Sequence, residues 1–186
     1  MSFCLIILAG GNSHRFGSNI GKPYQKIAGK SLIEINVNKA QKIKQIKKIV
    51  LVYNKNDSKK VKSLKLKNVK LVIGGSNRQK SAYNGLKHAI KIKGVSKVLI
   101  HDVARPNFSQ KLITKIIKNM RDAKAVVPMI KINDAVKQII ESSLNEYILG
   151  KKRENLFLTQ TPQAFRLKEI YNLHKFNASK YKDDDI

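Results

Sequence analysis

The stretch "SFCLIILAGGNSHRFGSNIGKPYQ", residues 2–25, decides the fold of this chain. It opens with an apolar run from Phe3 to Leu8, which is typical of a buried strand in a parallel sheet. Two glycines follow this run, and Arg15 and Lys22 come shortly after them. Glycine lets the backbone approach a ligand closely, and the two cations could reach the same phosphates. The stretch indicates a phosphate-binding loop, although an ordinary glycine turn with surface cations would have the same composition.

The spacing excludes two common phosphate-binding motifs. A Walker A loop has four residues between its first glycine and the Gly-Lys pair, and Ser or Thr follows. The segment "GSNIGKP" (17–23) has three residues there and ends in Pro23. No G-x-G-x-x-G pattern occurs either, so the dinucleotide-binding fingerprint is absent.

Strand and helix patterns alternate along the chain. Four more apolar runs rich in β-branched residues follow the first: Ile49–Val52, Val69–Ile73, Val98–Ile100 and Ala125–Met129. Helical patterns lie between most of them, and the clearest one has Ser109 as its N-cap. This alternation predicts an α/β fold, a Rossmann-like, mostly parallel sheet with helices on both faces. We expect all 186 residues to form one domain.

Polar motifs follow three of the predicted strands. They are "AGGNSHRFG" (9–17), "GGSNRQKS" (74–81) and "HDVARP" (101–106). Because the carboxyl ends of parallel strands meet at one edge of the sheet, these motifs should converge on one site. Asp102 is one of only three acidic residues before position 122. In so basic a chain, an isolated carboxylate after a strand suggests a ligand rather than a cap.

The pattern changes between Ile132 and Thr161. Short alternating segments and a turn replace the helices, which predicts a β-arm that projects from the sheet. An exposed apolar hairpin needs a covering surface, so we expect a homodimer formed through this arm. The chain stops in "KYKDDDI" without a change of pattern, and we expect its C-terminus to be truncated.

The net charge of +26 raises the alternative of a basic nucleic-acid-binding domain. The lysines are spread along the chain without a block of five, and few aromatic residues accompany them. They are therefore expected on solvated helix faces, with no membrane partner and no specific nucleic acid. No apolar run approaches the ~18 residues of a membrane helix. The single cysteine, Cys4, can form no internal disulfide, which favours a cytoplasmic protein.

Taken together, the motifs resemble those of the sugar- and polyol-phosphate nucleotidyltransferases. The opening segments "LAGGNSHRFG" (8–17) and "GKPYQKIAGKSLIE" (21–34) carry the general resemblance. Four others narrow it to the 2-C-methyl-D-erythritol 4-phosphate cytidylyltransferase family: "GGSNRQKSAYNGL" (74–86), "HDVARP" (101–106), "NDAVK" (133–137) and "TQTPQAF" (159–165). Lys22 is followed by Pro23 and Tyr24, as in members fused to the cyclodiphosphate synthase. A ribitol-5-phosphate cytidylyltransferase, which shares much of the nucleotide site, is the alternative.

The resemblance implies an enzyme of the non-mevalonate isoprenoid pathway that joins CTP to methylerythritol phosphate and releases pyrophosphate. A substrate phosphate oxygen would attack the α-phosphorus of CTP directly, with Arg15 and Lys22 as the catalytic cations. Asp102 would bind Mg²⁺ together with the phosphates. The remaining nucleotide-binding positions implied are Leu8, Ala9, Gly10, Gly11, Gly75, Ser76, Arg78 and Ser81.

The acceptor side of the site is implied at three positions. Arg105 would face the methylerythritol phosphate. Arg153 would reach from the arm into the partner subunit and hold the substrate phosphate, where bidentate binding favours arginine over lysine. Ala135 stands where a threonine commonly contacts the substrate, which leaves the choice of polyol phosphate open.

Overall fold

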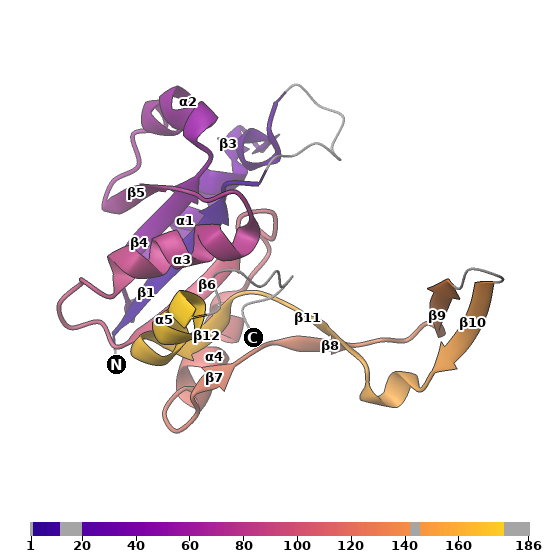
Figure 1. Ribbon diagram of the computed structural model, residues 1–186. Helices are drawn as coiled ribbons and strands as arrows, with labels where there is room; N and C mark the ends of the chain where they lie inside the picture. Colours follow the sequence, from indigo (N-terminus) through magenta and orange to yellow (C-terminus); the bar gives the residue numbers. More distant parts are fainter. Residues whose placement is uncertain (1, 12–19, 142–145, 177–186) are drawn as a thin grey trace.

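The computed structural model describes residues 2–11, 20–141 and 146–176 and contains a six-stranded sheet of order β5-β4-β1-β6-β12-β7 (Figure 1). Its strands are β1 (Phe3–Ala9), β4 (Ile46–Tyr53), β5 (Val69–Ile73), β6 (Lys97–Asp102), β7 (Ala125–Val126) and β12 (Gln163–Arg166). The first four are parallel to one another, and β12 runs antiparallel to both of its neighbours. The predicted mostly parallel sheet is confirmed.

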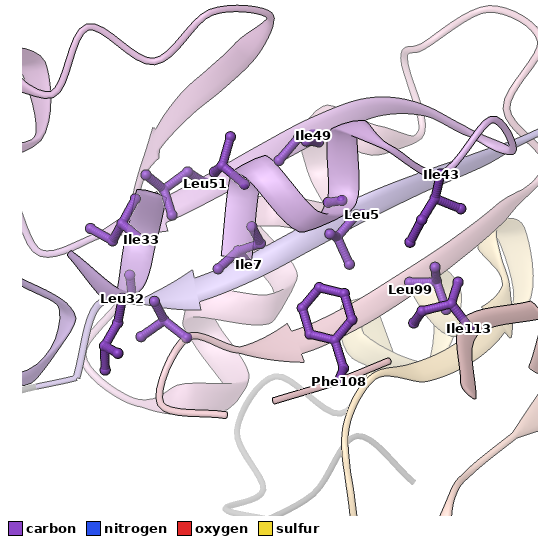
Figure 2. Packing of buried hydrophobic residues seen from close by; sticks show 14 of the residues in the cluster. Leu5, Ile7, Leu32, Ile33, Ile43, Ile49, Leu51, Leu99, Phe108 and Ile113 are labelled. Carbon is purple, nitrogen blue, oxygen red and sulfur yellow. The ribbon is translucent and has the colours of Figure 1, made fainter. Parts of the chain in front are cut away.

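Helices cover both faces of this sheet, as predicted. They are α1 (Leu32–Gln41), α2 (Ser58–Ser63), α3 (Arg78–Ala89), α4 (Gln110–Asn119) and α5 (Leu167–Phe176). Successive β1 side chains point to opposite faces. Leu5 and Ile7 pack toward α1 and α4, where Figure 2 shows them among Ile33, Leu99 and Ile113. Cys4 and Ile6 pack toward α3 and α5. All of β1 is buried, which explains its unbroken apolar sequence.

Local sequence signals start two of the helices. At α1, Ser31 Oγ accepts from the Glu34 N–H, and the Glu34 carboxylate accepts from the Ser31 N–H at 2.8 Å, which makes a capping box. At α4, Ser109 Oγ accepts from the Leu112 N–H at 3.1 Å, so the predicted N-cap is confirmed. No helix in the described part of the chain has the length and apolar character required to cross a bilayer.

The prediction of one strand from Ala125 to Met129 is wrong. The segment forms the two-residue edge strand β7 and then β8 (Met129–Lys131), which leaves the sheet. Pro128 lies between them and has no N–H to offer a strand ladder. The sheet position beside β6 is taken instead by β12, whose residues Gln163, Ala164 and Phe165 are all buried.

The projecting arm has two antiparallel ribbons. β8 pairs with β11 (Phe157–Thr159), and β9 (Val136–Glu141) pairs with β10 (Glu146–Lys151) at the far end, well away from the sheet (Figure 1). The arm therefore begins at β8, slightly before the predicted boundary.

Candidate functional site

A cavity of about 1220 Å³ lies beyond the carboxyl ends of β1, β4, β5 and β6. This is the edge at which parallel sheets bind ligands. Four loops and the short helices η2 (Lys22–Tyr24) and η3 (Lys55–Asp57) contribute to its wall. The described residues that line it are Leu8, Gly10, Gly11, Lys22, Asn54, Lys55, Asn56, Gly74, Gly75, Ser76, Asn77, Arg78, Ser81, Asp102, Ala104 and Arg105.

Most of the candidate residues from the sequence thus come together in one cavity, and three of the described ones do not. Ala9 lies in the core, with 2% of its surface exposed, and does not line the cavity. Ala135 and Arg153 lie on the arm, where Arg153 Nη1 donates to the Asn133 carbonyl at 2.5 Å. Arg15 lies outside the described residues.

Asp102 is the only carboxylate among the described lining residues, and two arginines flank it. Arg78 donates from Nε and Nη2 to Asp102 Oδ1 at 3.2 and 3.1 Å. Arg105 Nε lies 3.6 Å from Oδ2, and its Nη1 donates to Gln160 Oε1. The ion pair with Arg78 joins the end of β6 to the first turn of α3, and the one with Arg105 joins it to the loop after β6. Arg78 therefore has a structural role as a partner of Asp102, which its position in the sequence motif did not indicate.

The loop before α3 is a compact glycine turn. The Gly75 N–H donates to Ser81 Oγ at 3.0 Å, and Asn77 caps α3 by accepting from the Lys80 N–H at 2.8 Å. A Cβ on Gly75 would lie 2.3 Å from Lys80 Cβ and 2.9 Å from the Lys80 carbonyl carbon. No real Cβ tolerates such a contact, so only glycine permits this close approach. The glycine keeps the backbone of residues 74–76 at the cavity wall.

His101 is buried directly behind the cavity, with 0% of its surface exposed. Its Nε2 lies 2.9 Å from Asn36 Oδ1 and 3.1 Å from the Arg105 carbonyl oxygen, and its Nδ1 lies 2.9 Å from Thr161 Oγ1. Desolvation lowers the pKa of His101 to about 4, against a smaller opposing effect of the Asp102 charge. The ring is therefore neutral near pH 7. It does not line the cavity, so it is not placed to touch a ligand.

Two groups of residues near the cavity were missed in the sequence. Asn54, Lys55 and Asn56 follow β4, and the rule applied to the other strand ends could have identified them. Gln160 and Thr161 contact Arg105 and Asp102, respectively, from a segment about 55 residues further along the chain. The pairing of β12 with β6 brings that segment to the cavity, and no local sequence pattern predicts this pairing.

The charges of the cavity suit a polyanionic ligand. In the part of the chain that the structure describes, the cavity is lined by Lys22, Lys55, Arg78 and Arg105 beside a single carboxylate. Cations around a water-filled cavity raise the local concentration of anions such as a nucleoside triphosphate. The described lining residues include no cysteine or histidine, and Cys4 lies in the core with its thiol pKa raised to about 12 by burial. This set of groups can position and stabilise phosphates but offers no activated thiol or imidazole nucleophile.

Comparison with known proteins identifies one family. The family model IspD: 2-C-methyl-D-erythritol 4-phosphate cytidylyltransferase matches residues 3–185. A bifunctional enzyme IspD/IspF from Pelagibacter ubique is 43% identical over 184 residues, which cover 99% of this chain and 48% of that protein. A 2-C-methyl-D-erythritol 4-phosphate cytidylyltransferase from Clostridium botulinum is 33% identical over 188 residues, which cover 97% of this chain and 79% of that protein.

The fold is shared as well. The crystal structure of 4-diphosphocytidyl-2C-methyl-D-erythritol synthase from Anaerococcus prevotii aligns with a TM-score of 0.82 at 33% identity. The alignment covers 99% of this chain and 79% of that one. The chain spans about half the length of the bifunctional relatives that it matches.

The geometry of the glycine turn yields a prediction about CTP, the nucleotide that the motifs imply. Gly75→Ala should weaken CTP binding by roughly tenfold, since the new Cβ must push the turn away from α3 and break the bond to Ser81. Titration calorimetry measures the dissociation constant directly. The matched control is Gly21→Ala, where the Cβ would have no neighbour closer than 3.7 Å. Equal CTP affinity in the two variants would contradict a role of this turn in nucleotide binding.

Proposed function

The chain belongs to the 2-C-methyl-D-erythritol 4-phosphate cytidylyltransferase family, and we propose that it transfers the cytidylyl group of CTP to 2-C-methyl-D-erythritol 4-phosphate. The products are 4-diphosphocytidyl-2-C-methyl-D-erythritol and pyrophosphate, in the non-mevalonate pathway of isoprenoid biosynthesis. The observation that supports this most directly is the convergence of Lys22, Arg78, Asp102 and Arg105 on one cavity. Pyrophosphate release by the whole protein, with CTP and either methylerythritol phosphate or ribitol 5-phosphate, tests the proposal and its alternative.

The reaction needs positioned charge rather than a covalent intermediate. An oxygen of the acceptor phosphate forms the new bond to the α-phosphorus, and the bond from that phosphorus to the leaving pyrophosphate oxygen breaks. Negative charge builds up around the α-phosphorus, where fixed cations stabilise it. Lys22 at the cavity wall is suited to this task, and Arg15 is proposed to share it from outside the described residues.

The two ends of the cavity suit the two substrates. The backbone of the Gly74–Ser76 turn and the buried Ser81 hydroxyl are proposed to receive the cytosine and ribose of CTP, and the glycines at 10 and 11 its phosphates. Arg105 is exposed at the opposite side of Asp102 and is proposed to face the acceptor phosphate. Arg78 is proposed to shape the nucleotide-binding loop, and it also holds the Asp102 carboxylate.

Mg²⁺ is part of the proposal, with Asp102 as its protein ligand. The described residues contain no group of three or more His, Cys, Asp or Glu side chains that could enclose a metal. A single carboxylate nevertheless fits Mg²⁺, which commonly keeps water and binds one or two carboxylates together with substrate phosphates. The Asp102 side chain is 27% exposed beside the cavity and can therefore meet such an ion. When bound, Mg²⁺ neutralises phosphate charge.

Loss of the Lys22 charge should have a large effect on turnover. We expect Lys22→Ala to lower kcat by roughly 10²-fold or more, the scale for removing one preorganised charge from a transition state. Steady-state pyrophosphate release at saturating substrates measures it. Lys26→Ala removes a nearby exposed lysine outside the cavity lining and serves as the control. Turnover of the Lys22 variant within a few-fold of the control would remove Lys22 from the catalytic site.

The metal proposal predicts a change in the Mg²⁺ requirement. Asp102→Asn keeps the size of the side chain but removes its charge, so half-maximal activity should need more Mg²⁺ while the fold persists. Initial rates across a Mg²⁺ titration at fixed CTP provide the measurement, and circular dichroism checks the fold. Asp122→Asn, an exposed carboxylate outside the cavity lining, is the control. An unchanged titration curve would show that another group holds the ion.

The arm is proposed to form a homodimer with a shared active site. Its ribbon of β8 and β11 exposes four large apolar side chains: Met129 (58%), Ile130 (53%), Phe157 (41%) and Leu158 (53%). An exposed apolar patch of this kind marks an interaction site, and a second copy of the chain offers an identical patch to pack against it. Arg153 and Ala135 lie on the same arm, outside the cavity of their own chain. Their implied contact with the acceptor is possible if each arm reaches the neighbouring subunit.

Mixing two inactive variants tests this arrangement. An Arg153→Ala protein and a Lys22→Ala protein are combined under conditions that allow subunits to exchange. In a shared-site dimer, the heterodimer has one site with both defects and one intact site, so about half of the wild-type activity per heterodimer should return. If Arg153 acts within its own chain, every site keeps one defect and no activity returns. The homotypic mixtures are the controls.

A cytoplasmic location completes the proposal. Cys4 is a free, buried thiol, as is usual for chains that fold in a reducing compartment, and CTP is a cytoplasmic metabolite.

A further inference from the structure

We propose that His101 is a positioning residue: with Asn36 and Thr161 it forms a directed chain of buried hydrogen bonds that holds the loop carrying Asp102 and Arg105. The inference deepens the proposed function and rests on it for its kinetic part. The three side chains come from α1, from the end of β6 and from the segment that precedes β12. Their exposures are 0% for His101 and Asn36 and 7% for Thr161.

The contacts of Asn36 fix the orientation of its amide. Its Nδ2 group donates to the Leu32 carbonyl at 2.7 Å and to the Val103 carbonyl at 2.9 Å. Both hydrogens of this nitrogen are thereby used, and Oδ1 faces His101 Nε2 as an acceptor.

The tautomer of His101 follows from its acceptors. Nε2 lies within hydrogen-bond distance of Asn36 Oδ1 and of the Arg105 carbonyl oxygen, neither of which can donate. Nε2 must therefore carry the hydrogen. In the neutral ring Nδ1 then has a lone pair, and it accepts from the Thr161 hydroxyl at 2.9 Å. Thr161 Oγ1 in turn accepts from the Asp102 N–H at 3.3 Å.

The bonds of this chain converge on the backbone of one loop. They engage the Asp102 N–H, the Val103 carbonyl and the Arg105 carbonyl. The Val103 N–H donates separately to the Leu8 carbonyl at 3.1 Å, which ties the same loop to β1. Hydrogen bonds from α1, from the segment before β12 and from β1 therefore hold the backbone of this loop. Its side chains at Asp102 and Arg105 remain directed to their ion pairs and the cavity.

The burial of the ring excludes direct chemistry. His101 has no exposed surface, and Phe108 packs against it in a T-shaped contact with centroids 4.8 Å apart. A group in this position cannot exchange protons with a substrate, but it can set the direction in which Asp102 and Arg105 point. Small displacements of such groups have large kinetic costs, because phosphoryl transfer depends on alignment.

The hydroxyl of Thr161 can be replaced by a methyl group without changing the shape of the side chain. Thr161→Val deletes the link between His101 and the Asp102 N–H, whereas Thr161→Ser keeps the oxygen. We expect Thr161→Val to lower kcat by about tenfold and to speed exchange of the Asp102 amide hydrogen by about tenfold, with Thr161→Ser within about threefold of wild type on both measures. Equal behaviour of the two variants in amide exchange would overturn the proposal.

A double-mutant cycle separates positioning from a direct contact of Thr161 with substrate. His101→Gln can keep a donor near the Nε2 position but lacks the acceptor at Nδ1. If both residues act through one hydrogen bond, the double variant should be no slower than the slower single variant, whereas multiplied effects on kcat would overturn the shared link.

The tautomer offers a readout that needs no activity. In wild-type protein labelled with ¹⁵N in its histidines, the resonance lost in His101→Gln should report a neutral ring protonated at Nε2. A hydrogen on Nδ1 would overturn the directed chain. The variant serves only to assign the wild-type resonance, so this outcome counts even if His101→Gln is partly unfolded. Absence of cytidylyl transfer by wild-type protein, with the predicted tautomer and amide exchange intact, would refute the proposed function and the kinetic role together. The directed chain itself would then remain supported.

Discussion

The ion pair between Arg78 and Asp102 is the interaction around which the site is arranged. It joins the end of β6 to the start of α3, the helix that follows β5. In the sheet, β5 and β6 lie on opposite sides of β4 and β1. A partly exposed ion pair of this kind contributes little to stability by itself. Its consequence is geometric: the carboxylate is fixed between two guanidinium groups, with one oxygen occupied by Arg78 and the other near Arg105.

The strong positive charge of the chain indicates a kind of ligand only at this edge of the sheet. Lysines are spread over the exposed faces of the helices, where water screens them, and they identify no partner. Among the described residues of the cavity, by contrast, two lysines and two arginines lie beside a single carboxylate, and the glycine turn at Gly75 contributes backbone to the same wall. The excess of cations over carboxylates in one concave space is what distinguishes a phosphate site from a merely basic surface.

The site also depends on residues behind its wall. His101 has no access to a ligand, yet its contacts reach Asn36, Thr161 and the Arg105 carbonyl. The buried polar chain and the exposed ion pairs thus act on the same loop from its two sides. The arm enters this arrangement at its base, because Gln160 contacts both Arg105 and the Pro128 carbonyl. The base of the arm and Arg105 are therefore connected through Gln160.

The sequence by itself determined the α/β class, the central strands, the Ser109 cap and most lining residues. These follow from apolar runs, helical periodicity and the rule that parallel strands end at one edge, all of which are local or nearly local properties. Its motifs also led to the correct family. Only the tertiary structure decided the insertion of β12 beside β6, the Arg78–Asp102 pair and the surroundings of His101. Each joins segments far apart in the chain, and their pairing depends on the packed sheet, which no short stretch of sequence encodes.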